Sequence, residues 1–358
     1  MTGQKHSRAP NNFGALRLYL ASTVFLYHIF ALTRHEDLWF LAGFDPEFAV
    51  RGFFVISGFL IAGSAKRTGG SKGYWRNRIL RIVPAYVVAL FLGVGVALSS
   101  SPQLGWGDLI ASDTLKYLGA NLLFLNFLAP GISPAFDDNI YTAINGSLWT
   151  IKIEVGFYLF APLLVRIFSH RRPWIAFSVI YVLSSAWVIG LQEWYELSNQ
   201  GFLLVLMRQL PGQMSYFVIG MAWHLIPMRD TKTLLRILVP STLLFVVAYQ
   251  GGALHQLMMP LAVGGIILPL AFWPSKLSRL DDFGDLSYGV YVYHFPIVQG
   301  LIVCGLFTSA HSAWLGAFTA VGIVTSLSAA SWFGLENPRL KFKRPNSTSA
   351  MASSHSKA

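Results

Sequence analysis

Apolar stretches long enough to cross a lipid bilayer recur from one end of this sequence to the other. A membrane-spanning helix needs about 20 mostly apolar residues, and residues 13–32 form the first such stretch. Only 12% of the residues are charged, whereas about a quarter are charged in an ordinary soluble protein. Because the stretches are long and continuous rather than short and alternating, the pattern predicts an all-α, polytopic membrane helix bundle and not a β-barrel.

The positions of lysine and arginine predict how the helices are oriented. A basic segment with Lys66, Arg67 and Arg76 separates the second stretch from the third, and such clusters mark the cytosolic side. Counting from there, we predict about ten transmembrane helices with both termini in the cytosol. Their approximate bounds are residues 13–32, 47–65, 79–98, 146–168, 174–191, a sixth that ends near residue 223, 237–249, 257–273, 286–307 and 314–335. Pro211 and Gly212 interrupt the early part of the sixth.

The same pattern predicts one integral membrane domain. We place it at residues 13–338, after a cytosolic segment at residues 1–12 and before a basic, Ser-rich tail at residues 339–358 with the composition of a disordered segment. Residues 115–128 are apolar but too short to span, so they predict an interfacial or re-entrant helix. The net charge of +11 lies between the spans, so we expect membrane lipids and not nucleic acid as partners.

The first stretch contains two ionisable side chains, Arg17 and His28. Eleven residues make almost three helical turns, so both side chains lie on one face of the helix, roughly 16 Å apart. His28 then lies deep in the membrane, where ionisable groups normally face a protein interior or a watery cavity. Arg17 could instead be an anchor at the membrane surface. We interpret this face as one wall of an active site.

Two later stretches carry ionisable groups at a similar depth. Glu154 lies about nine residues into a span that enters from the outer side, roughly 13 Å down. Tyr288, Tyr291 and His294 follow one another at helical spacing, although an aromatic stripe of this kind is often only packing. We therefore expect His28 and Glu154 to meet in one interior chamber.

Arg78 and Arg81 stand three residues apart at the cytosolic start of the third span. The general enrichment of basic residues on the cytosolic side explains Arg81 less well than Arg78, because Arg81 should already be inside the span. Paired guanidinium groups suit a phosphate-bearing ligand, since each can form two hydrogen bonds to phosphate. Two His and one Glu could form a zinc site, but the sequence has no His-Glu-x-x-His and no Cys pair, so we expect no metal.

Taken together, these motifs resemble the type 3 acyltransferase family of integral membrane proteins. One departure is Arg51-Gly52, where many members of the family have an acidic residue. The matching elements follow the family's order across nearly the whole chain: Arg17 with His28, residues 53–60 (FFVISGFL), Arg78-x-x-Arg81-x-x-Pro84, Ser147-Leu148-Trp149-Thr150 with Glu154 and Phe157-Tyr158-Leu159, Ser287-Tyr288 with Tyr291 and His294, and Glu336-Asn337-Pro338.

The resemblance implies an O-acyltransferase of the bacterial plasma (inner) membrane. Such an enzyme moves an acyl group, usually acetyl from acetyl-CoA, to a hydroxyl of a saccharide or lipid-linked saccharide, with acyl-CoA as a co-substrate and no bound cofactor. Arg78 and Arg81 would hold the CoA phosphates at the cytosolic face. His28 would act as the base with Glu154 as its orienting partner, and Arg17 would stabilise negative charge on the donor or the tetrahedral intermediate.

Other residues of the matching motifs complete the expected site. We expect His294 and Tyr291, together with Trp149 and Ser57, to line the path of the substrate. The sequence leaves open whether His28 acts directly as a base or first accepts the acyl group. Two other functions also fit: a glycan or lipid transporter or flippase, in which buried ionisable groups couple to protons, and O-acylation of a small hydroxylated metabolite.

Overall fold

The computed structural model describes residues 11–68, 71–226 and 230–338, and the structural statements below refer to these residues. Most of the expected N-terminal cytosolic segment (residues 1–12) and the whole expected tail (residues 339–358) lie outside the described residues.

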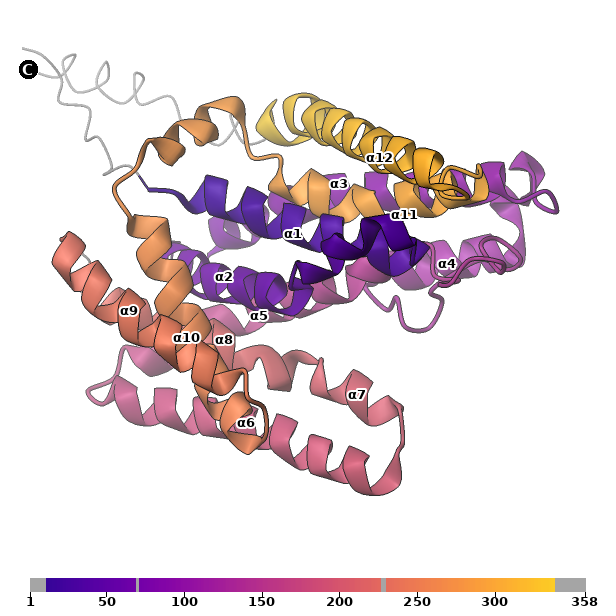
Figure 1. Cartoon of the computed structure of the whole chain (residues 1–358). Helices are drawn as coiled ribbons and strands as arrows, with labels where there is room; N and C mark the ends of the chain where they lie inside the picture. Colours follow the sequence, from indigo (N-terminus) through magenta and orange to yellow (C-terminus); the bar gives the residue numbers. More distant parts are fainter. Residues whose placement is uncertain (1–10, 69–70, 227–229, 339–358) are drawn as a thin grey trace, which may run out of the picture.

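The described residues form helices joined by loops, with no β-strand among them (Figure 1). The α-helices are α1 (Phe13–Thr33), α2 (Pro46–Thr68), α3 (Lys72–Ser100), α4 (Ser112–Leu122), α5 (Trp149–Phe168), α6 (Pro173–Ser198), α7 (Phe202–Met207), α8 (Leu210–Ala222), α9 (Thr231–Ala248), α10 (Ala253–Phe272), α11 (Ser287–Val303) and α12 (Ala310–Ser331). The shorter turns are η1 (Glu36–Gly43), η2 (Trp106–Ile110), η3 (Gly146–Leu148), η4 (Trp223–Leu225), η5 (Lys276–Phe283) and η6 (Trp332–Glu336). The predicted all-α fold is confirmed.

Eight segments of the described chain are long and apolar enough to cross a membrane. Of the helices expected to span, α5 and α11 do not meet this criterion. α11 has only 17 residues, and any 18-residue part of α5 contains Lys152, Glu154 and Arg166. These two helices carry Glu154, Tyr291 and His294 of the expected site. The polytopic bundle is confirmed, while the count of ten spans and the cytosolic termini stay predictions.

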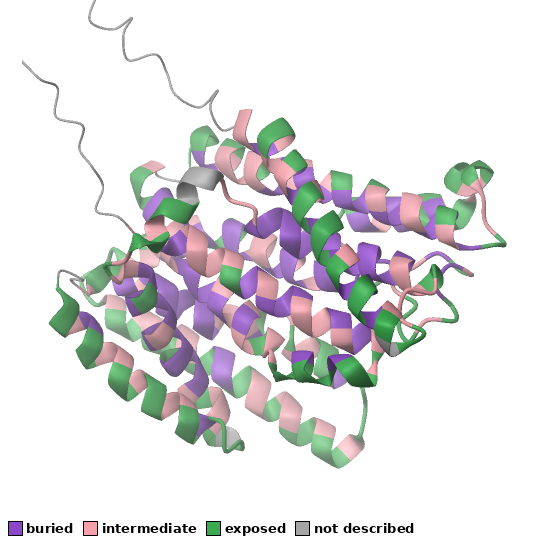
Figure 2. Cartoon of the chain, turned by 45° about the horizontal axis from the view of Figure 1, so that its top comes forward, coloured by how far each residue is buried: buried purple, intermediate pink, exposed green. Residues whose placement is uncertain are grey.

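The central helix of the bundle is α11. All its residues from Ser287 to Gly300 are buried, and it packs against α1, α3 and α12. Figure 2 shows the buried residues concentrated on the inner helices and the exposed ones on the outer helices. Many exposed side chains are large and apolar: Leu183, Leu243 and Phe318 are 64%, 63% and 69% exposed. An apolar outer surface around a polar-edged inner helix is the arrangement expected in a bilayer.

Two glycines bring the backbones of α2 and α8 into contact. A Cβ atom on Gly58 would lie 2.0 Å from the carbonyl oxygen of Phe217, and one on Gly220 would lie 2.0 Å from that of Val55. Small residues commonly allow such close approach between membrane helices. Gly58 belongs to the FFVISGFL motif, so this contact fixes the position of the neighbouring Ser57.

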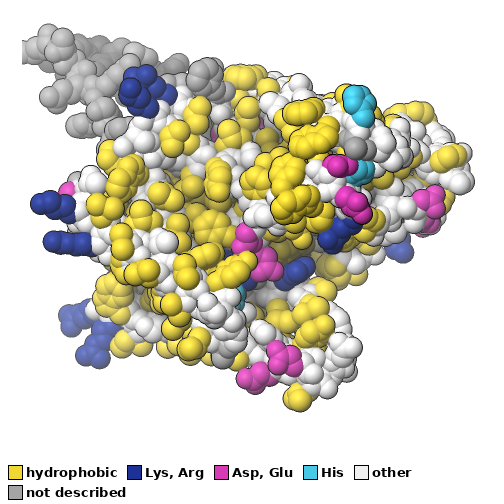
Figure 3. Space-filling view, in the orientation of Figure 1, with side chains coloured by type: hydrophobic (Ala, Val, Ile, Leu, Met, Phe, Trp, Pro, Cys, Tyr) yellow, Lys and Arg dark blue, Asp and Glu magenta, His cyan; other side chains and the backbone are white. Residues whose placement is uncertain are grey.

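The charges are divided between the two ends of the bundle. Lys66 and Arg67 near the end of α2, Arg171 and Arg172 before α6, and Lys232 in α9 lie at one end, which we call the basic end. Figure 3 shows Lys and Arg side chains at the left edge of the molecule and Asp and Glu mainly elsewhere. The orientation in which the basic end faces the cytosol was predicted from these same residues and stays a prediction.

Two irregular segments also agree with the sequence analysis. The sixth predicted span is interrupted: α7 ends at Met207, and α8 begins with Pro211 in its first turn. A Cβ atom on Gly212 would lie 2.1 Å from the carbonyl oxygen of Met207, so glycine allows the sharp break there. The helix expected at residues 115–128 corresponds in part to α4, which begins earlier, at Ser112, and ends at Leu122, so residues 123–128 are not helical.

Candidate active site

His28 on α1 pairs with His294 on α11. Nδ1 of His28 is 2.8 Å from Nε2 of His294, and the two rings are stacked with their centroids 5.0 Å apart. The rings of Phe25 and Phe295 pack against this pair. The structure therefore brings together the two histidines that the sequence singled out.

The hydrogen bonds of His294 determine the tautomer of both rings. Nδ1 of His294 is 3.0 Å from the carbonyl oxygen of Val290, which can only accept, so this Nδ1 carries the proton. In a neutral His294, Nε2 is then an acceptor, and Nδ1 of His28 must donate to it. The lone pair of a neutral His28 is consequently on Nε2.

His28 lines a cavity of about 420 Å³, which we call the imidazole cavity. Trp149 at the start of α5 lines the same cavity, as do Arg51 and Arg208. The guanidinium of Arg208 lies over the Trp149 ring, 6.0 Å from its centroid. Figure 3 shows acidic and basic side chains around a hollow between the α1–α2 and α6–α7 parts of the molecule. Charged and aromatic groups thus surround the predicted base.

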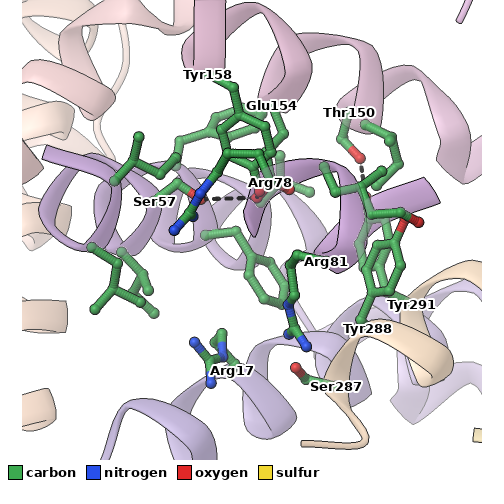
Figure 4. A pocket seen from close by; sticks show the side chains of 18 residues that line it. Arg17, Ser57, Arg78, Arg81, Thr150, Glu154, Tyr158, Ser287, Tyr288 and Tyr291 are labelled. Carbon is green, nitrogen blue, oxygen red and sulfur yellow. Dashed lines mark hydrogen bonds between the residues drawn. The ribbon is translucent and has the colours of Figure 1, made fainter. Parts of the chain in front are cut away.

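A second cavity, which we call the guanidinium cavity, lies nearer the basic end. It is lined by Arg17, Arg78 and Arg81, and also by Ser57, Glu154 and Tyr158 (Figure 4). The two predicted phosphate-binding arginines are therefore neighbours. Arg17 lies with them and not beside His28.

Two of these arginines are held by buried carboxylates. Asp285 Oδ2 lies 2.9 Å from Nη2 of Arg17 and 2.6 Å from Nη2 of Arg81, and Glu336 Oε2 lies 3.3 Å from Nη1 of Arg81. Burial acts to raise the pKa of the Asp285 carboxyl, but Arg17 and Arg81 outweigh it and hold that pKa below its usual range. This network joins the first and last described helical segments at the same end of the bundle.

Arg78 differs from its two neighbours because no carboxylate within the described ranges forms an ion pair with it. Its Nη2 donates to the hydroxyl of Ser64 at 3.2 Å, and its guanidinium lies over the rings of Tyr74 and Tyr158. Its buried Nε has no hydrogen-bond partner. Arg78 thus retains the most capacity to bind an anion.

Glu154 does not pair with His28, which corrects the expectation of one shared chamber. Its Oε1 accepts a hydrogen bond from Tyr158 at 2.6 Å and one from Ser57 at 3.4 Å. The sequence gives the depth of Glu154 along the axis of α5, but it does not give the rotation of α5 about that axis. In the structure, this rotation directs Glu154 toward the guanidinium cavity. The partner of His28 is His294 instead.

The two cavities are adjacent because Val50 and Tyr291 line both of them. Thr150 donates to the carbonyl oxygen of Ser147 at 3.1 Å, so the Tyr291 hydroxyl, 2.8 Å away, donates to Thr150. The Thr150–Tyr291 hydrogen bond (Figure 4) holds the Tyr291 ring, which lines both cavities. His294 lines neither of these two cavities and lies behind His28.

The beginning of α5 is fixed to α11 by polar contacts. Asn145 donates to the carbonyl oxygen of Val292 at 2.8 Å and accepts from the hydroxyl of Ser147 at 2.7 Å. A Cβ atom on Gly146 would lie 2.8 Å from the ring of Phe295. The Ser-Leu-Trp-Thr motif therefore places Trp149 in the imidazole cavity through its contacts with α11.

Sequence reasoning missed Asp285 and Arg208. Asp285 is a single acidic residue before the ninth predicted span, and its position beside Ser287-Tyr288 was an available signal. Arg208 precedes the break marked by Pro211, but nothing in the sequence connects it with Trp149. No group of three or more His, Cys, Asp or Glu that could hold a metal ion occurs in the part of the chain that the structure describes.

Comparison with known proteins supports the resemblance seen in the sequence. The chain is 28% identical to nodulation protein 10 of Rhizobium leguminosarum bv. viciae, over 93% of this chain and 94% of that protein. It is 25% identical to an O-acetyl transferase of Shigella phage Sf6, over 82% of this chain and 86% of that protein. It is also 25% identical to the peptidoglycan O-acetyltransferase OatA of Listeria monocytogenes, over 79% of this chain and 48% of that protein. No solved structure matches significantly.

The family assignment rests on a match to nearly the whole described chain. The sequence profile of the family's acyltransferase domain covers residues 11–333, which include both cavities and the His28–His294 pair. The chain therefore belongs to the type 3 acyltransferase family, a family of multi-pass membrane acyltransferases.

Proposed function

We propose that this protein is an O-acyltransferase of the bacterial plasma membrane that moves an acyl group, acetyl by default, from acyl-CoA to a saccharide hydroxyl. The donor enters at the basic end and the acceptor, free or lipid-linked, binds at the opposite end. The observation that carries this proposal is the pair of adjacent cavities. One is lined by three guanidinium groups, the other contains His28, and Val50 and Tyr291 lie between them.

The guanidinium cavity fits the phosphates of the donor. Arg78 has no carboxylate partner among the described residues, while Arg17 and Arg81 share one oxygen of Asp285 and keep further N–H groups. Arginine binds phosphate through two parallel hydrogen bonds. We assign the CoA phosphates to Arg78 and Arg81, with Arg17 beside them, and Glu154 as the residue that holds Tyr158 under Arg78.

The reaction needs a base because a sugar hydroxyl is a poor nucleophile. Nε2 of His28 removes the hydroxyl proton while the oxygen attacks the thioester carbonyl carbon. The C–O ester bond forms, the C–S bond breaks, and the proton passes from His28 to the sulfur, which leaves as the CoA thiol. The hydrogen bond from Nδ1 to His294 keeps Nε2 directed toward the cavity and stabilises the transient imidazolium.

The imidazole cavity fits a saccharide acceptor. Sugars offer hydroxyl groups for hydrogen bonds and C–H faces for aromatic rings, and this cavity provides Arg51, Gln213 and Trp149. Two of the similar proteins are named O-acetyl transferase and peptidoglycan O-acetyltransferase. We therefore prefer a glycan acceptor to a small hydroxylated metabolite.

The direct test measures thioester consumption by purified protein in liposomes. Labelled acetyl-CoA is added on one side, and glycan from a strain that lacks the gene is added as the acceptor. We expect labelled glycan and one free CoA thiol per acetyl group transferred. The His28→Ala variant should be inserted normally but lose both products, whereas His311→Ala, on the exposed start of α12, should retain them.

Two results would contradict the proposal. Movement of glycan across the liposome membrane without release of CoA thiol would identify a transporter. Near-normal acetylation by His28→Ala would remove His28 from the mechanism.

A further inference from the structure

A third cavity lies beside the imidazole cavity at the end of the bundle opposite the basic end. It has a volume of about 420 Å³ and is lined by residues at the start of α2, in the C-terminal part of α6, in the α9–α10 connection and in the first half of α10. We call it the distal cavity. None of the residues assigned above to donor binding or to proton transfer lines it.

The distal cavity adjoins the imidazole cavity. Glu47 and Arg51 line both cavities, and their side chains form an ion pair at 2.9 Å. The Arg51 guanidinium also lies over the ring of Tyr216, 5.6 Å from its centroid, which fixes its position. The ion pair therefore forms the boundary between the two cavities, and a ligand with one end near His28 would reach the distal cavity across these two side chains.

We infer that the distal cavity binds further sugar units of the acceptor, so the acceptor is an oligosaccharide or polysaccharide and not a single sugar or small metabolite. This inference rests on the proposed function and specifies its substrate class. Its basis is that a polar cavity, lined by no residue assigned to donor binding or proton transfer, lies beside the cavity that contains His28.

The side chains of the distal cavity suit sugar hydroxyls. Two carboxylates, one guanidinium, one imidazole and two carboxamides line it, and these planar groups give donors and acceptors at fixed angles. They are Asp45, Glu47, Arg51, His255, Gln192 and Gln256.

Several of these groups keep hydrogen-bonding capacity. Nδ1 of His255 donates to the carbonyl oxygen of Ala248 at 2.9 Å, so Nε2 of the neutral ring remains an acceptor. The amide of Gln256 donates to that of Gln192 over a long contact of 3.5 Å, and Gln192 donates to Glu196 at 3.3 Å. The cavity can therefore exchange weak internal contacts for contacts to a ligand.

An aromatic side chain completes this surface. Tyr249 lines the distal cavity and is 65% exposed. An exposed ring beside polar groups can stack on the C–H face of a sugar while its hydroxyl stays in water. Trp149 offers a second aromatic face in the imidazole cavity.

The test uses acceptor fragments of graded length. The glycan that wild-type protein acetylates is stripped of ester groups with mild base, partly hydrolysed and separated into fragments of increasing numbers of sugars. The measured quantity is the ratio of kcat/KM for a long fragment to that for a single sugar. This ratio does not depend on how much of each variant is folded.

We expect the ratio to rise with fragment length in wild-type protein. Gln256→Ala and Tyr249→Ala should each lower it about fivefold, as expected for the loss of one hydrogen bond or stacking contact. Gln200→Ala is the matched control, since Gln200 is exposed in the α6–α7 loop and lines none of the three cavities.

Two results would overturn the inference while leaving the proposed function intact. One is a wild-type ratio that does not rise with length. The other is a rise that both variants retain in full, which would mean that length is sensed elsewhere. If wild-type protein acetylates no saccharide at all, the proposed function fails first and this inference fails with it.

Discussion

Nδ1 of His28 lies 2.8 Å from Nε2 of His294, although the two residues are 266 positions apart in the chain. The carbonyl oxygen of Val290 fixes the proton of His294, and His294 in turn fixes the proton of His28. The nitrogen that faces the cavity is therefore the one without a proton. An imidazole placed in this way is prepared to accept a proton before any substrate arrives.

The first prediction concerns His294 as a positioning residue. His294→Ala should lower kcat about tenfold to a hundredfold, less than the full loss of a general base, because His28 can then adopt the wrong tautomer or rotate. KM for acetyl-CoA should change little. His294→Gln should restore much of the rate, since its side-chain oxygen can accept the proton of His28 Nδ1, and the pH dependence of kcat should shift in the Ala variant only. An equal loss in both variants would argue for a packing role.

The second prediction concerns Arg78 and the donor. Arg78→Ala should raise KM for acetyl-CoA about tenfold or more, which is the expected effect of removing a charged hydrogen bond to phosphate. Acceptor KM should stay within about twofold. Arg76→Ala is the control, because Arg76 is exposed two residues away and does not line the guanidinium cavity. Equal donor KM values for the two variants would exclude Arg78 from donor binding.

The third prediction concerns the stability contributed by Asp285. Asp285→Ala leaves Arg17 and Arg81 facing each other without their shared carboxylate, so the free energy of unfolding should fall by roughly 3 kcal/mol. Thermal unfolding in detergent measures this, with Asp113→Ala on the exposed side of α4 as the control.

The lowered pKa of Asp285 gives the same prediction a pH dependence. Burial alone would raise that pKa above 3.8, but the two guanidinium groups lower it below that value in the folded protein. The stabilisation should therefore be complete above pH 3.8 and should decline as the pH falls through the lower folded-state pKa. A difference between wild type and Asp285→Ala that vanishes near neutral pH would contradict this account.

The fourth prediction concerns the packing of α2 on α8. Gly58→Ala places a Cβ atom 2.0 Å from the carbonyl oxygen of Phe217, so the helices must move apart. We expect a loss of about 1–3 kcal/mol in stability and a lower yield of monodisperse protein. Gly190→Ala in α6 is the control, because its Cβ would meet nothing within 4 Å. Size-exclusion profiles and unfolding temperatures of the two variants compare the effects directly.

The helical bundle could be predicted from the sequence because long apolar stretches are enough to identify membrane helices. The interrupted sixth span followed from Pro211 and Gly212, whose backbone requirements are local. The position of Arg17 and His28 on one helix was equally local. These predictions depend on residues close together in the chain, where spacing determines geometry.

The partners within the site could not be predicted, because they depend on how helices rotate about their axes and pack. Depth alone made Glu154 a plausible partner for His28, but it bonds Tyr158 and Ser57 instead. Arg81 was read only as a phosphate ligand, whereas Asp285 and Glu336 already hold it. The polar side chains of α5 and α11 could form hydrogen bonds with several different partners. The packing of the helices decides which of these bonds form.

The position of Tyr291 between the two cavities has a consequence for the cell. Tyr291 and Val50 line both cavities, so a donor in the guanidinium cavity and a glycan in the imidazole cavity lie on either side of the boundary that these two side chains form. Only the thioester end of the donor has to pass it. Neither the nucleotide part of the donor nor the polymer would then have to cross the membrane. The acyl group could be transferred from one side to the other without opening a pore for ions.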